Sequence, residues 1–210
     1  MNAHMDHLGT VARDESSKLI LERARDASSE GPVFLLGDLN STEEGGAYLT
    51  LTGSKYQDSL KNDTLANLQA LNETSASAYA KQTGLPIRTG EGSISLPTHR
   101  VIRPGKILEN LQKQQQQVLY FEDASHELMT RLKSQGALGT LSGPYGYRDT
   151  FTSFNEGDNE AKRAPIRIDF IMTLSDRNIV IHHYAALSNQ FDDGLHFSDH
   201  RPVLSRISWN

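Results

Sequence analysis

Residues 32–40 read Pro32-Val33-Phe34-Leu35-Leu36-Gly37-Asp38-Leu39-Asn40. The apolar run at 32–36 is too short for a stable helix, and a glycine ends it. Continuous apolar character over so few residues is typical of a strand that is buried on both faces. The stretch therefore predicts one strand of a central sheet, followed by a polar turn at the carboxyl end of that strand.

The polar turn is a candidate site because it contains Asp38 and Asn40. Side chains two positions apart on an extended backbone point the same way, so the carboxylate and the amide are expected to face one cleft. Ser41 and Glu44 have the spacing of a capping box, which predicts a helix that begins at Ser41 and runs through Tyr48 and Leu51. The dipole of that helix would favour a bound phosphate. The alternative is an Asx turn that carries no chemistry.

Two histidines and an acid lie close together at the start of the chain. His4 and Asp6 have strand spacing, and His7 follows them. A His-X-Asp-His segment can form part of a zinc site, but no further ligand motif accompanies it, so zinc is the weaker interpretation. Small and apolar residues at helical spacing over residues 11–27, with charges between them, predict an amphipathic surface helix.

Strand character returns in the last third of the chain. Alternating, apolar or β-branched stretches predict strands at residues 149–154, 167–172, 179–184 and 202–207. Helices are expected between the earlier strands, while strands dominate the end of the chain. This order predicts an α/β sandwich of mixed sheets and not a simple βαβ series.

Asp169 is an acid inside one of these predicted strands. Burying a carboxylate without a partner is costly, so Asp169 should be paired, hydrogen-bonded or close to a metal. A histidine is the partner we expect. The alternatives are a position that faces solvent at the end of the strand, or an ion pair with Arg167 or another cation.

The segment before the last predicted strand reads Ser198-Asp199-His200-Arg201-Pro202. It offers a carboxylate as a metal ligand, an imidazole for proton transfer and a guanidinium that can bind an anion. Adjacent side chains on an extended backbone point apart, so a turn is needed to aim both Asp199 and His200 inward. The alternative is an ordinary polar loop.

The middle of the chain has a different composition. Residues 83–104 are rich in Gly, Pro, Ser and Thr, and residues 106–133 have helical composition that four consecutive glutamines interrupt. We predict an irregular insertion at about 81–141 that carries one or two helices. Its composition favours a solvent-exposed segment without chemistry.

Composition restricts the kind of site that is possible. The 210 residues are compatible with one domain or one large part of a domain, and the absence of cysteine excludes disulfides, thiolate metal sites and cysteine nucleophiles. A metal would therefore be held by oxygen or imidazole. The net charge of -5 provides no global attraction for nucleic acid. The sequence contains no apolar stretch that could cross a bilayer and no secretory signal, and it leaves the localisation open.

Five short motifs taken in order resemble the second half of the endonuclease/exonuclease/phosphatase superfamily of metal-dependent phosphoester hydrolases. They are Asn2-Ala3-His4-Met5-Asp6-His7, Gly37-Asp38-Leu39-Asn40, Tyr145-Gly146 with Thr150-Phe151-Thr152-Ser153-Phe154, Arg167-Ile168-Asp169-Phe170-Ile171, and Ser198-Asp199-His200-Arg201-Pro202. The resemblance implies that residues 1–210 form a partial domain of this kind. It implies a four-layered α/β sandwich of the DNase I-like type, N-terminally truncated, with the site at one edge of two packed sheets.

The resemblance also implies catalytic roles. Asp38 would orient or deprotonate the attacking water, and Asn40 would hold a phosphate oxygen in the transition state. His200 would contact the scissile phosphate, while Asp169 would fix the tautomer of His200 and favour its charged form.

Two further residues complete the implied site. Asp199 would help to hold a divalent ion, and His4 would be a second histidine facing the phosphate. Oxygen ligands make Mg²⁺ the implied cofactor, with Mn²⁺ as a substitute. The implied substrate is a phosphoester, open among nucleic acid, phospholipid head groups and small phosphoesters.

The chain departs from the family pattern at its beginning. In the family, an early asparagine and a metal-binding glutamate precede the His-X-Asp segment, which here stands at residues 4–6. Glu15, Glu22 and Glu30 lie in or next to the predicted surface helix and do not replace that glutamate. We therefore expect sheet edges and apolar faces without cover. Two functions stay open: a phosphoester hydrolase impaired by the missing segment, and a catalytically inactive fragment or binding protein that retains the fold.

Overall fold

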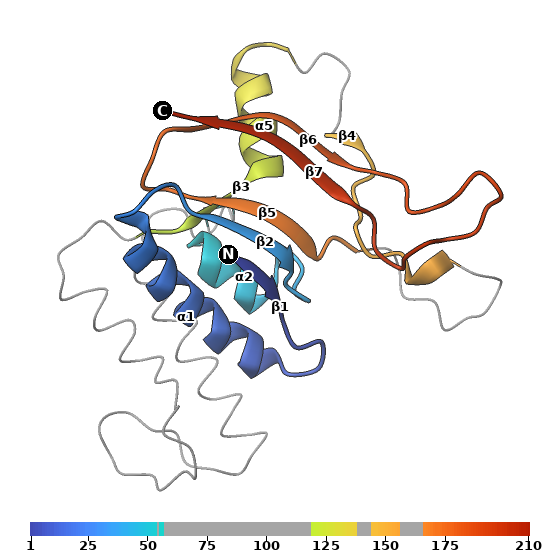
Figure 1. The fold of residues 1–210 in the computed structure, drawn as a ribbon, viewed down its shortest axis with the longest axis horizontal. Coiled ribbons are helices and arrows are strands. Elements are labelled where there is room, and N and C mark those ends of the chain that lie inside the picture. The colour runs from blue at the N-terminus through green and yellow to red at the C-terminus, as the bar shows by residue number, and fades with distance from the viewer. Residues whose placement is uncertain (54, 57–118, 138–143, 156–165) are drawn as a thin grey trace, which may run out of the picture.

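The computed structural model describes residues 1–53, 55–56, 119–137, 144–155 and 166–210. Figure 1 shows two β-sheets lying one above the other, with helices on the outer face of the lower sheet. Both sheets are mixed, as the sequence predicted. The described chain therefore has a mixed α/β fold.

The first sheet has four strands in the order β1-β2-β5-β3. Strand β1 is parallel to β2, whereas β5 is antiparallel to both β2 and β3. The second sheet has the order β4-β6-β7, with β4 parallel and β7 antiparallel to β6. The strand bounds are β1 Asn2–His4, β2 Phe34–Asp38, β3 Phe121–Asp123, β4 Tyr145–Gly146, β5 Asp169–Leu174, β6 Ile179–Ala186 and β7 Val203–Trp209.

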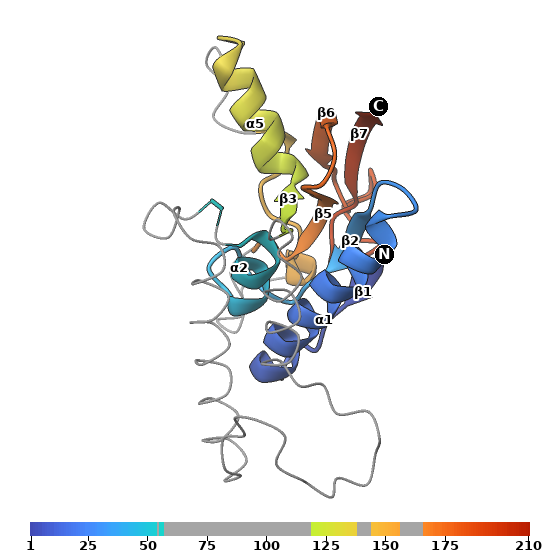
Figure 2. The same ribbon diagram turned by 90° about the vertical axis from the view of Figure 1, so that its left-hand side faces the viewer.

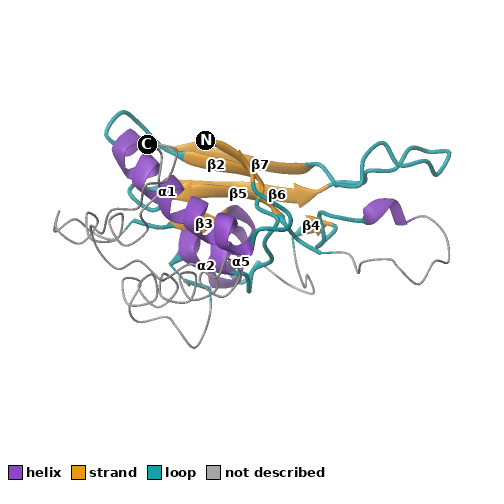
Figure 3. Cartoon of the chain, turned by 90° about the horizontal axis from the view of Figure 1, so that it is seen from below, coloured by secondary structure: helices purple, strands orange, loops and turns teal. Residues whose placement is uncertain are grey.

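Three helices of the described residues cover the sheets. Helices α1 (Thr10–Ser28) and α2 (Gly46–Thr52) lie against the lower face of the first sheet, whereas α5 (Ala124–Ser134) packs beside β5 and β6 (Figures 1 and 3). Helix α1 matches the helix predicted at residues 11–27. Among the helices of the described ranges, none is long and apolar enough to span a membrane.

The core consists of two clusters on opposite faces of the first sheet. Alternation along β5 explains the division, because successive side chains of a strand point to opposite faces. Phe170 and Met172 join the cluster formed with α1 and α2, whereas Ile171 joins the cluster formed with α5 and β6. The first sheet is therefore buried on both faces along β5.

A close backbone approach fixes β1 against β2. Gly37 has φ +135°, and a Cβ atom at this position would lie 1.9 Å from the carbonyl oxygen of Ala3. Only glycine fits without displacing one strand. The backbone N–H of Met5 donates to the carbonyl of Asp38 at 3.0 Å. The end of β1 is thereby held beside the end of β2.

The helix predicted to begin at Ser41 begins at Gly46, so the prediction of a capping box at Ser41 and Glu44 is wrong. The Ser41 hydroxyl donates to the Thr42 carbonyl, and the N-cap Gly45 makes no side-chain capping bond. Residues 41–45 form a turn from which Glu43 reaches distant partners instead of closing a local cap. The expectation of a helix dipole beside Asp38 was therefore wrong as well.

The strand predicted at residues 149–154 is also wrong. Phe151 forms single bridges with Ile166 on one side and His200 on the other, and a 3-10 turn follows at Ser153–Asn155. Ser153 and Phe154 both have positive φ, which ends any extended backbone. The alternation in this sequence reflects contacts with two separate segments and not a continuous ladder.

Part of the predicted insertion lies within the described residues. Residues 119–137 contain β3, which pairs with β5, and α5, whose N-cap Asp123 accepts from the backbone N–H of Ser125. Residues 81–118 and 138–141 lie outside the described ranges. The limits of the insertion stay a prediction.

Both sheets end in an open strand on the same side of the molecule. β1 and β7 are terminal strands of their sheets, and Figures 1 and 2 place them on one side. Large apolar side chains are exposed nearby, with Leu36 42% and Trp209 51% accessible. The expectation of sheet edges and apolar faces without cover is met among the described residues.

Candidate active site

Strand register brings three of the predicted site residues into one row. His4 at the end of β1 pairs with Asp38 at the end of β2, and Asp38 pairs with Asp169 at the start of β5. Neighbouring strands are about 5 Å apart, so residues paired in this way are close neighbours. Residues separated by up to 165 positions thus meet at one end of the first sheet.

Asp38 and Asn40 contact each other directly. The backbone N–H of Asn40 donates to Asp38 Oδ1 at 2.7 Å, and Asn40 Nδ2 donates to Asp38 Oδ2 at 3.1 Å. Asn40 Nδ2 also donates to the carbonyl of Met5 at 2.8 Å. The turn has the backbone contact of an Asx turn and also fixes the Asp38 carboxylate. Asn40 therefore ties Asp38 to the segment that follows β1.

His200 is the histidine partner that was expected for Asp169. Its Nδ1 lies 2.8 Å from Asp169 Oδ2, and its Nε2 lies 3.9 Å from Asp38 Oδ2. A hydrogen on Nδ1 bound to Asp169 directs Nε2 towards Asp38. The imidazole thus lies between two carboxylates, each from a different strand. Arg167, the alternative partner, binds Asp123 instead.

A network of short contacts holds the loop that carries His200. The N–H and hydroxyl of Thr152 both donate to the carbonyl of Asp199, at 2.7 and 3.0 Å. The buried Asn189 donates through Nδ2 to Thr152 Oγ1 and to the carbonyl of Ser198. The ring of Phe151 lies edge-on to His200, with 5.1 Å between centroids. These contacts supply the turn that the sequence required.

Thr150 forms hydrogen bonds with two segments that carry site residues. Its buried hydroxyl oxygen accepts from the backbone N–H groups of Ile168 and Asp169, both at 3.0 Å. Its carbonyl accepts from the backbone N–H of Arg201 at 2.6 Å. One residue therefore holds both the segment entering β5 and the segment following His200.

Two predicted residues differ from this group. The His4 side chain is 79% exposed, with Nε2 3.6 Å from Asp38 Oδ2, so it stands at the rim. Among the described residues, the ligand atoms that gather within 4.8 Å are those of Asp38, Asp169 and His200, and Asp199 is not among them. The structure thus brings Asp38, Asn40, Asp169 and His200 together, with His4 at the rim, and the carboxylate of Asp199 is not in the three-residue ligand group.

The alternative zinc cluster has no counterpart in the described structure. Asp6 Oδ1 accepts from the backbone N–H groups of Leu8 and Gly9, which lead into α1. These two bonds lower the pKa of Asp6. His4, Asp6 and His7 do not form a metal-ligand group among the described residues.

The surroundings of Asp38 change its proton affinity. Burial raises the pKa of Asp38, the hydrogen bond from the Asn40 backbone N–H opposes that effect, and the nearby charge of Asp169 raises the pKa further. The net result is a raised pKa, despite the lowering effect of His200 and His4. A carboxylate with a raised pKa is a better proton acceptor near neutral pH.

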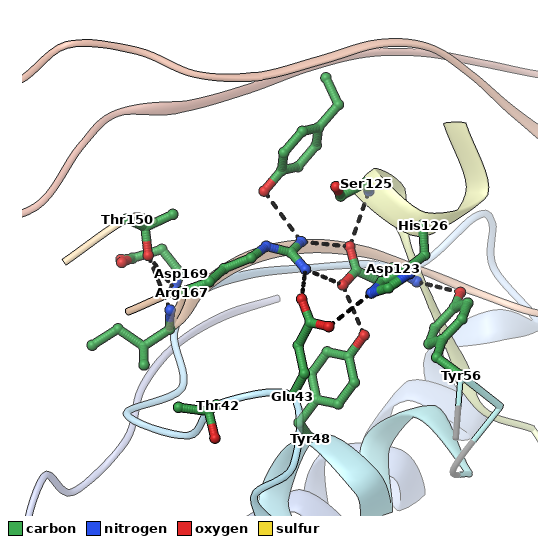
Figure 4. Close-up of polar contacts among 12 residues, drawn as sticks. Thr42, Glu43, Tyr48, Tyr56, Asp123, Ser125, His126, Thr150, Arg167 and Asp169 are labelled. Carbon is green, nitrogen blue, oxygen red and sulfur yellow. Dashed lines mark hydrogen bonds and ion pairs between the residues drawn. The ribbon is translucent and has the colours of Figure 1, made fainter. Parts of the chain in front are cut away.

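A second polar cluster was missed in the sequence (Figure 4). Arg167 Nη1 binds Glu43 Oε1 at 2.6 Å, and its two terminal nitrogens bind both oxygens of the fully buried Asp123. His126 Nε2 lies 3.0 Å from Glu43 Oε2. Arg167 precedes Asp169 by two residues, and an arginine entering an apolar strand was the one available signal.

Both clusters offer three possible metal ligands, but their charge differs. In the group formed by Glu43, Asp123 and His126, both carboxylates already bind the guanidinium of Arg167. In the group of Asp38, Asp169 and His200, the two carboxylates have only imidazoles as nearby cations among the described residues. Two carboxylates suit a hard divalent ion, so this donor set fits Mg²⁺ or Mn²⁺ better.

The second cluster predicts a stability maximum at mildly acidic pH. Burial alone would raise the pKa of Glu43, but the His126 hydrogen bond and the Arg167 charge lower it to about 2. Burial lowers the pKa of His126, yet Glu43 and Asp123 raise it above 6.5 overall. The contribution of Glu43 is present above pH 4.5 and lost towards pH 2, whereas that of His126 is present below pH 6.5 and lost above it.

Urea unfolding measured from pH 2 to pH 9 checks this prediction. Glu43→Gln should remove roughly 1–2 kcal/mol at pH 5.5, a value reduced by the partial exposure of the side chain. The same variant should flatten the decline towards pH 2. A parent protein whose stability rises steadily from pH 5 to pH 9 would contradict the assignment.

Comparisons with known proteins agree with the fold but are distant. No protein-family model and no curated protein matches the sequence. An endonuclease/exonuclease/phosphatase from Bacteroides vulgatus is similar in structure, with 16% identity, a TM-score of 0.50, and coverage of 99% of this chain and 48% of that one. A mannosyl-6-phosphatase from Bacteroides thetaiotaomicron has 16% identity, a TM-score of 0.46, and coverage of 99% and 50%.

A functionally unknown conserved protein from Enterococcus faecalis has 18% identity, a TM-score of 0.48, and coverage of 100% of this chain and 49% of that one. The chain thus spans about half the length of the solved structures that it resembles. At 16% identity, the likeness to the Bacteroides vulgatus protein shows the fold alone. The mixed α/β fold of this chain is thus similar to that of about half of the Bacteroides vulgatus protein.

Proposed function

We propose that this protein is a divalent-metal-dependent hydrolase of phosphoester bonds. The observation that carries the proposal is the convergence of Asp38, Asp169 and His200, whose ligand atoms lie within 4.8 Å of one another at the ends of two strands. A base, an imidazole and an anionic metal-binding group at one place are what hydrolysis of a phosphoester requires. The fold shared with an endonuclease/exonuclease/phosphatase protein supports this reading.

The contacts suggest what each side chain does. Asp38 accepts the proton of the attacking water, and Asn40 holds the Asp38 carboxylate in place. In its doubly protonated form, His200 donates from Nε2 to the phosphate while its Nδ1–H donates to Asp169. His4, at the exposed rim, contacts the phosphate from the side of β1. Holding these groups in place before reaction reduces the reorganisation that the transition state needs.

A divalent ion fits the donor set. Carboxylate oxygens of Asp38 and Asp169 would hold Mg²⁺, and Asp199, the ligand implied by the resemblance, would join them after a change of side-chain direction. When bound, such an ion neutralises charge on the phosphate and stabilises the developing negative charge. Mn²⁺ has similar ligand preferences and is expected to substitute.

The wider architecture belongs to the same proposal. We infer a four-layered sandwich of the DNase I-like type, to which residues 1–210 contribute a partial domain and residues 81–141 an insertion. The open edges at β1 and β7, with Leu36 and Trp209 exposed, support further strands on that side. The substrate stays open among nucleic acid, phospholipid head groups and small phosphoesters.

One observation favours a second candidate, a catalytically inactive fragment or binding protein. The three-residue group contains two carboxylates, and one of them is already hydrogen-bonded to His200. A site with only a few oxygen ligands binds Mg²⁺ weakly. Turnover by this chain is therefore expected to be slow even if the proposal is correct.

Metal removal tests the proposal against that candidate. Hydrolysis of bis(4-nitrophenyl) phosphate and 4-nitrophenyl phosphate should fall about a hundredfold in excess EDTA, because the ion supplies several kcal/mol of charge stabilisation. Added Mg²⁺ or Mn²⁺ should restore the rate, whereas Zn²⁺ should not. A protein that is well folded, binds Mg²⁺ and cleaves neither compound would decide for the second candidate.

A further inference from the structure

We propose that Glu43 and Arg167 are positioning residues of the candidate active site. Together they fix the loop that follows β2, which carries Asn40, to the segment that enters β5, and so restrict movement of this loop beside Asp38 and Asp169. The inference rests on the proposed function in so far as these two carboxylates are catalytic. Neither Glu43 nor Arg167 belongs to the group that would touch the substrate.

The two segments are joined at two places. Next to Asp38 and Asp169, the backbone N–H of Leu39 donates to the carbonyl of Ile168 at 2.9 Å. Farther from them along both segments, Arg167 Nη1 donates to Glu43 Oε1 at 2.6 Å. The loop from Asp38 to Glu43 is therefore attached at its start and at its end. A loop held at both ends has fewer conformations available than a loop held at one end.

Arg167 can serve as an anchor because it is itself immobilised. Its guanidinium binds Asp123 through two parallel contacts of 2.7 and 2.8 Å, and it lies over the ring of Phe170, 4.6 Å from the centroid. Nη2 also donates to the hydroxyl of Tyr184 at 3.2 Å. A bidentate guanidinium–carboxylate contact fixes orientation as well as distance. The position of Glu43 is thus defined relative to two sheets.

Asp123 extends the anchor into the core (Figure 4). Its carboxylate accepts from the backbone N–H of Ser125 at the start of α5 and from the hydroxyl of Tyr48 in α2, both at 2.9 Å. Asp123 and Tyr48 are completely buried. Breaking one member of such a buried set leaves its partners unsatisfied, so the arrangement is rigid. Asp123, at the end of β3, is thus tied to α2 and α5, and it holds the Arg167 guanidinium that binds Glu43.

The two carboxylates of this cluster already have a cationic partner. Among the described residues, Glu43 and Asp123 bind the guanidinium of Arg167, Glu43 also contacts His126, and the Tyr184 hydroxyl accepts from Arg167. A merely structural cluster would affect the free energy of unfolding alone. A positioning cluster should also affect the turnover number and the order of the loop.

Glu43→Gln, Arg167→Lys and the matched control Glu122→Gln separate these roles in the full chain. Glu122 is a carboxylate of similar exposure, ion-paired with Lys55 at 2.7 Å and without contact to Arg167. We expect Glu43→Gln to lower kcat for bis(4-nitrophenyl) phosphate about tenfold with KM changed less than about twofold, because small displacements of catalytic groups affect the reaction more than binding. Arg167→Lys, which keeps the charge but loses the bidentate contact with Asp123, should lower kcat at least as much as Glu43→Gln does, and Glu122→Gln should not lower it.

Amide hydrogen exchange provides a readout that does not depend on activity. In Glu43→Gln, exchange at Leu39, Ile168 and Asp169 should accelerate about tenfold or more, while amides in the interior of β6 keep the parent rate. If Glu43→Gln does not fold, Glu43→Asp, which is one methylene shorter, takes its place. Uniform acceleration over all sheets, or equal losses of kcat in Glu43→Gln and Glu122→Gln, would overturn the positioning role. An inactive parent would refute the proposed function, and exchange at these three amides would still decide the attachment.

Discussion

Replacing His200 with alanine is expected to lower kcat for metal-dependent phosphoester hydrolysis about 100- to 1000-fold. The variant removes the imidazole whose Nε2 faces the space beside Asp38 and leaves the Asp169 carboxylate without its 2.8 Å partner. Loss of one preorganised contact to the transition state has an effect of this size. Steady-state kinetics with and without Mg²⁺ provide the measurement.

His182→Ala is the matched control for this variant. His182 is an exposed histidine of β6 whose ring bonds to the Ser208 hydroxyl at 2.7 Å, away from the site. Its removal should leave kcat within about twofold of the parent. The double variant His200→Ala, Asp169→Asn should be little slower than His200→Ala alone, since residues that act as a unit are not additive. Activity of His200→Ala equal to that of the parent would refute the role of His200.

The part of the site that was predictable follows from local rules. Period-two geometry predicted that Asp38 and Asn40 lie together, but the structure achieves this through a turn in which Asn40 has φ +45°. The cost of burying a charge required a partner for Asp169. The parallel and antiparallel pairing of β1, β2 and β5 made His4, Asp38 and Asp169 neighbours.

The side-chain direction of Asp199 could not be predicted by such local rules. It is adjacent to His200, and the direction of its side chain depends on a turn that Thr152 and Asn189 fix from elsewhere in the chain. The backbone carbonyl of Asp199 is what these contacts hold, and its carboxylate is not part of the three-residue group. Local sequence does not contain that information. Whether Asp199 binds a metal stays a prediction.

The capping box failed for a related reason. The spacing of Ser41 and Glu44 satisfies a local pattern, but Glu43 between them binds a residue 124 positions away. That long-range contact fixes the turn, and the helix begins only at Gly46, after the N-cap Gly45. Tertiary contacts overrode local preference here. The apolar pattern of 32–36 did predict a strand, which runs from Phe34 to Asp38, but the expected burial on both faces was wrong because Leu36 is exposed.

The cluster of Glu43, Asp123, His126 and Arg167 could not be predicted from the sequence, for a different reason. Asp123 and His126 lie in the range 81–141, whose composition predicted an exposed segment without chemistry. Only the pairing of β3 with β5 brings Asp123 to Arg167, 44 residues later in the chain. Composition averages over a range and hides a short strand and helix within it. Single residues in such a range become visible only in the fold.

Replacing Asp38 with asparagine is expected to lower kcat about 100- to 10,000-fold and to weaken Mn²⁺ binding about tenfold or more. The amide keeps the shape of the carboxylate but neither accepts a proton efficiently nor supplies an anionic oxygen to the metal. The free fraction of Mn²⁺, followed by electron paramagnetic resonance during titration, measures binding separately from turnover. Unfolding of the variant in urea checks that the β1–β2 contact is retained.

Asp199→Asn is the informative comparison, because the two aspartates are rival metal ligands. Asp38 belongs to the group of close ligand atoms and Asp199 does not, so Asp38→Asn should weaken Mn²⁺ binding more than Asp199→Asn does. Weaker binding in Asp199→Asn alone would mean that Asp199 turns inward to hold the ion and that Asp38 acts only on the proton. Unchanged Mn²⁺ affinity in both variants, with kcat for Asp38→Asn equal to that of the parent, would remove Asp38 from the active site.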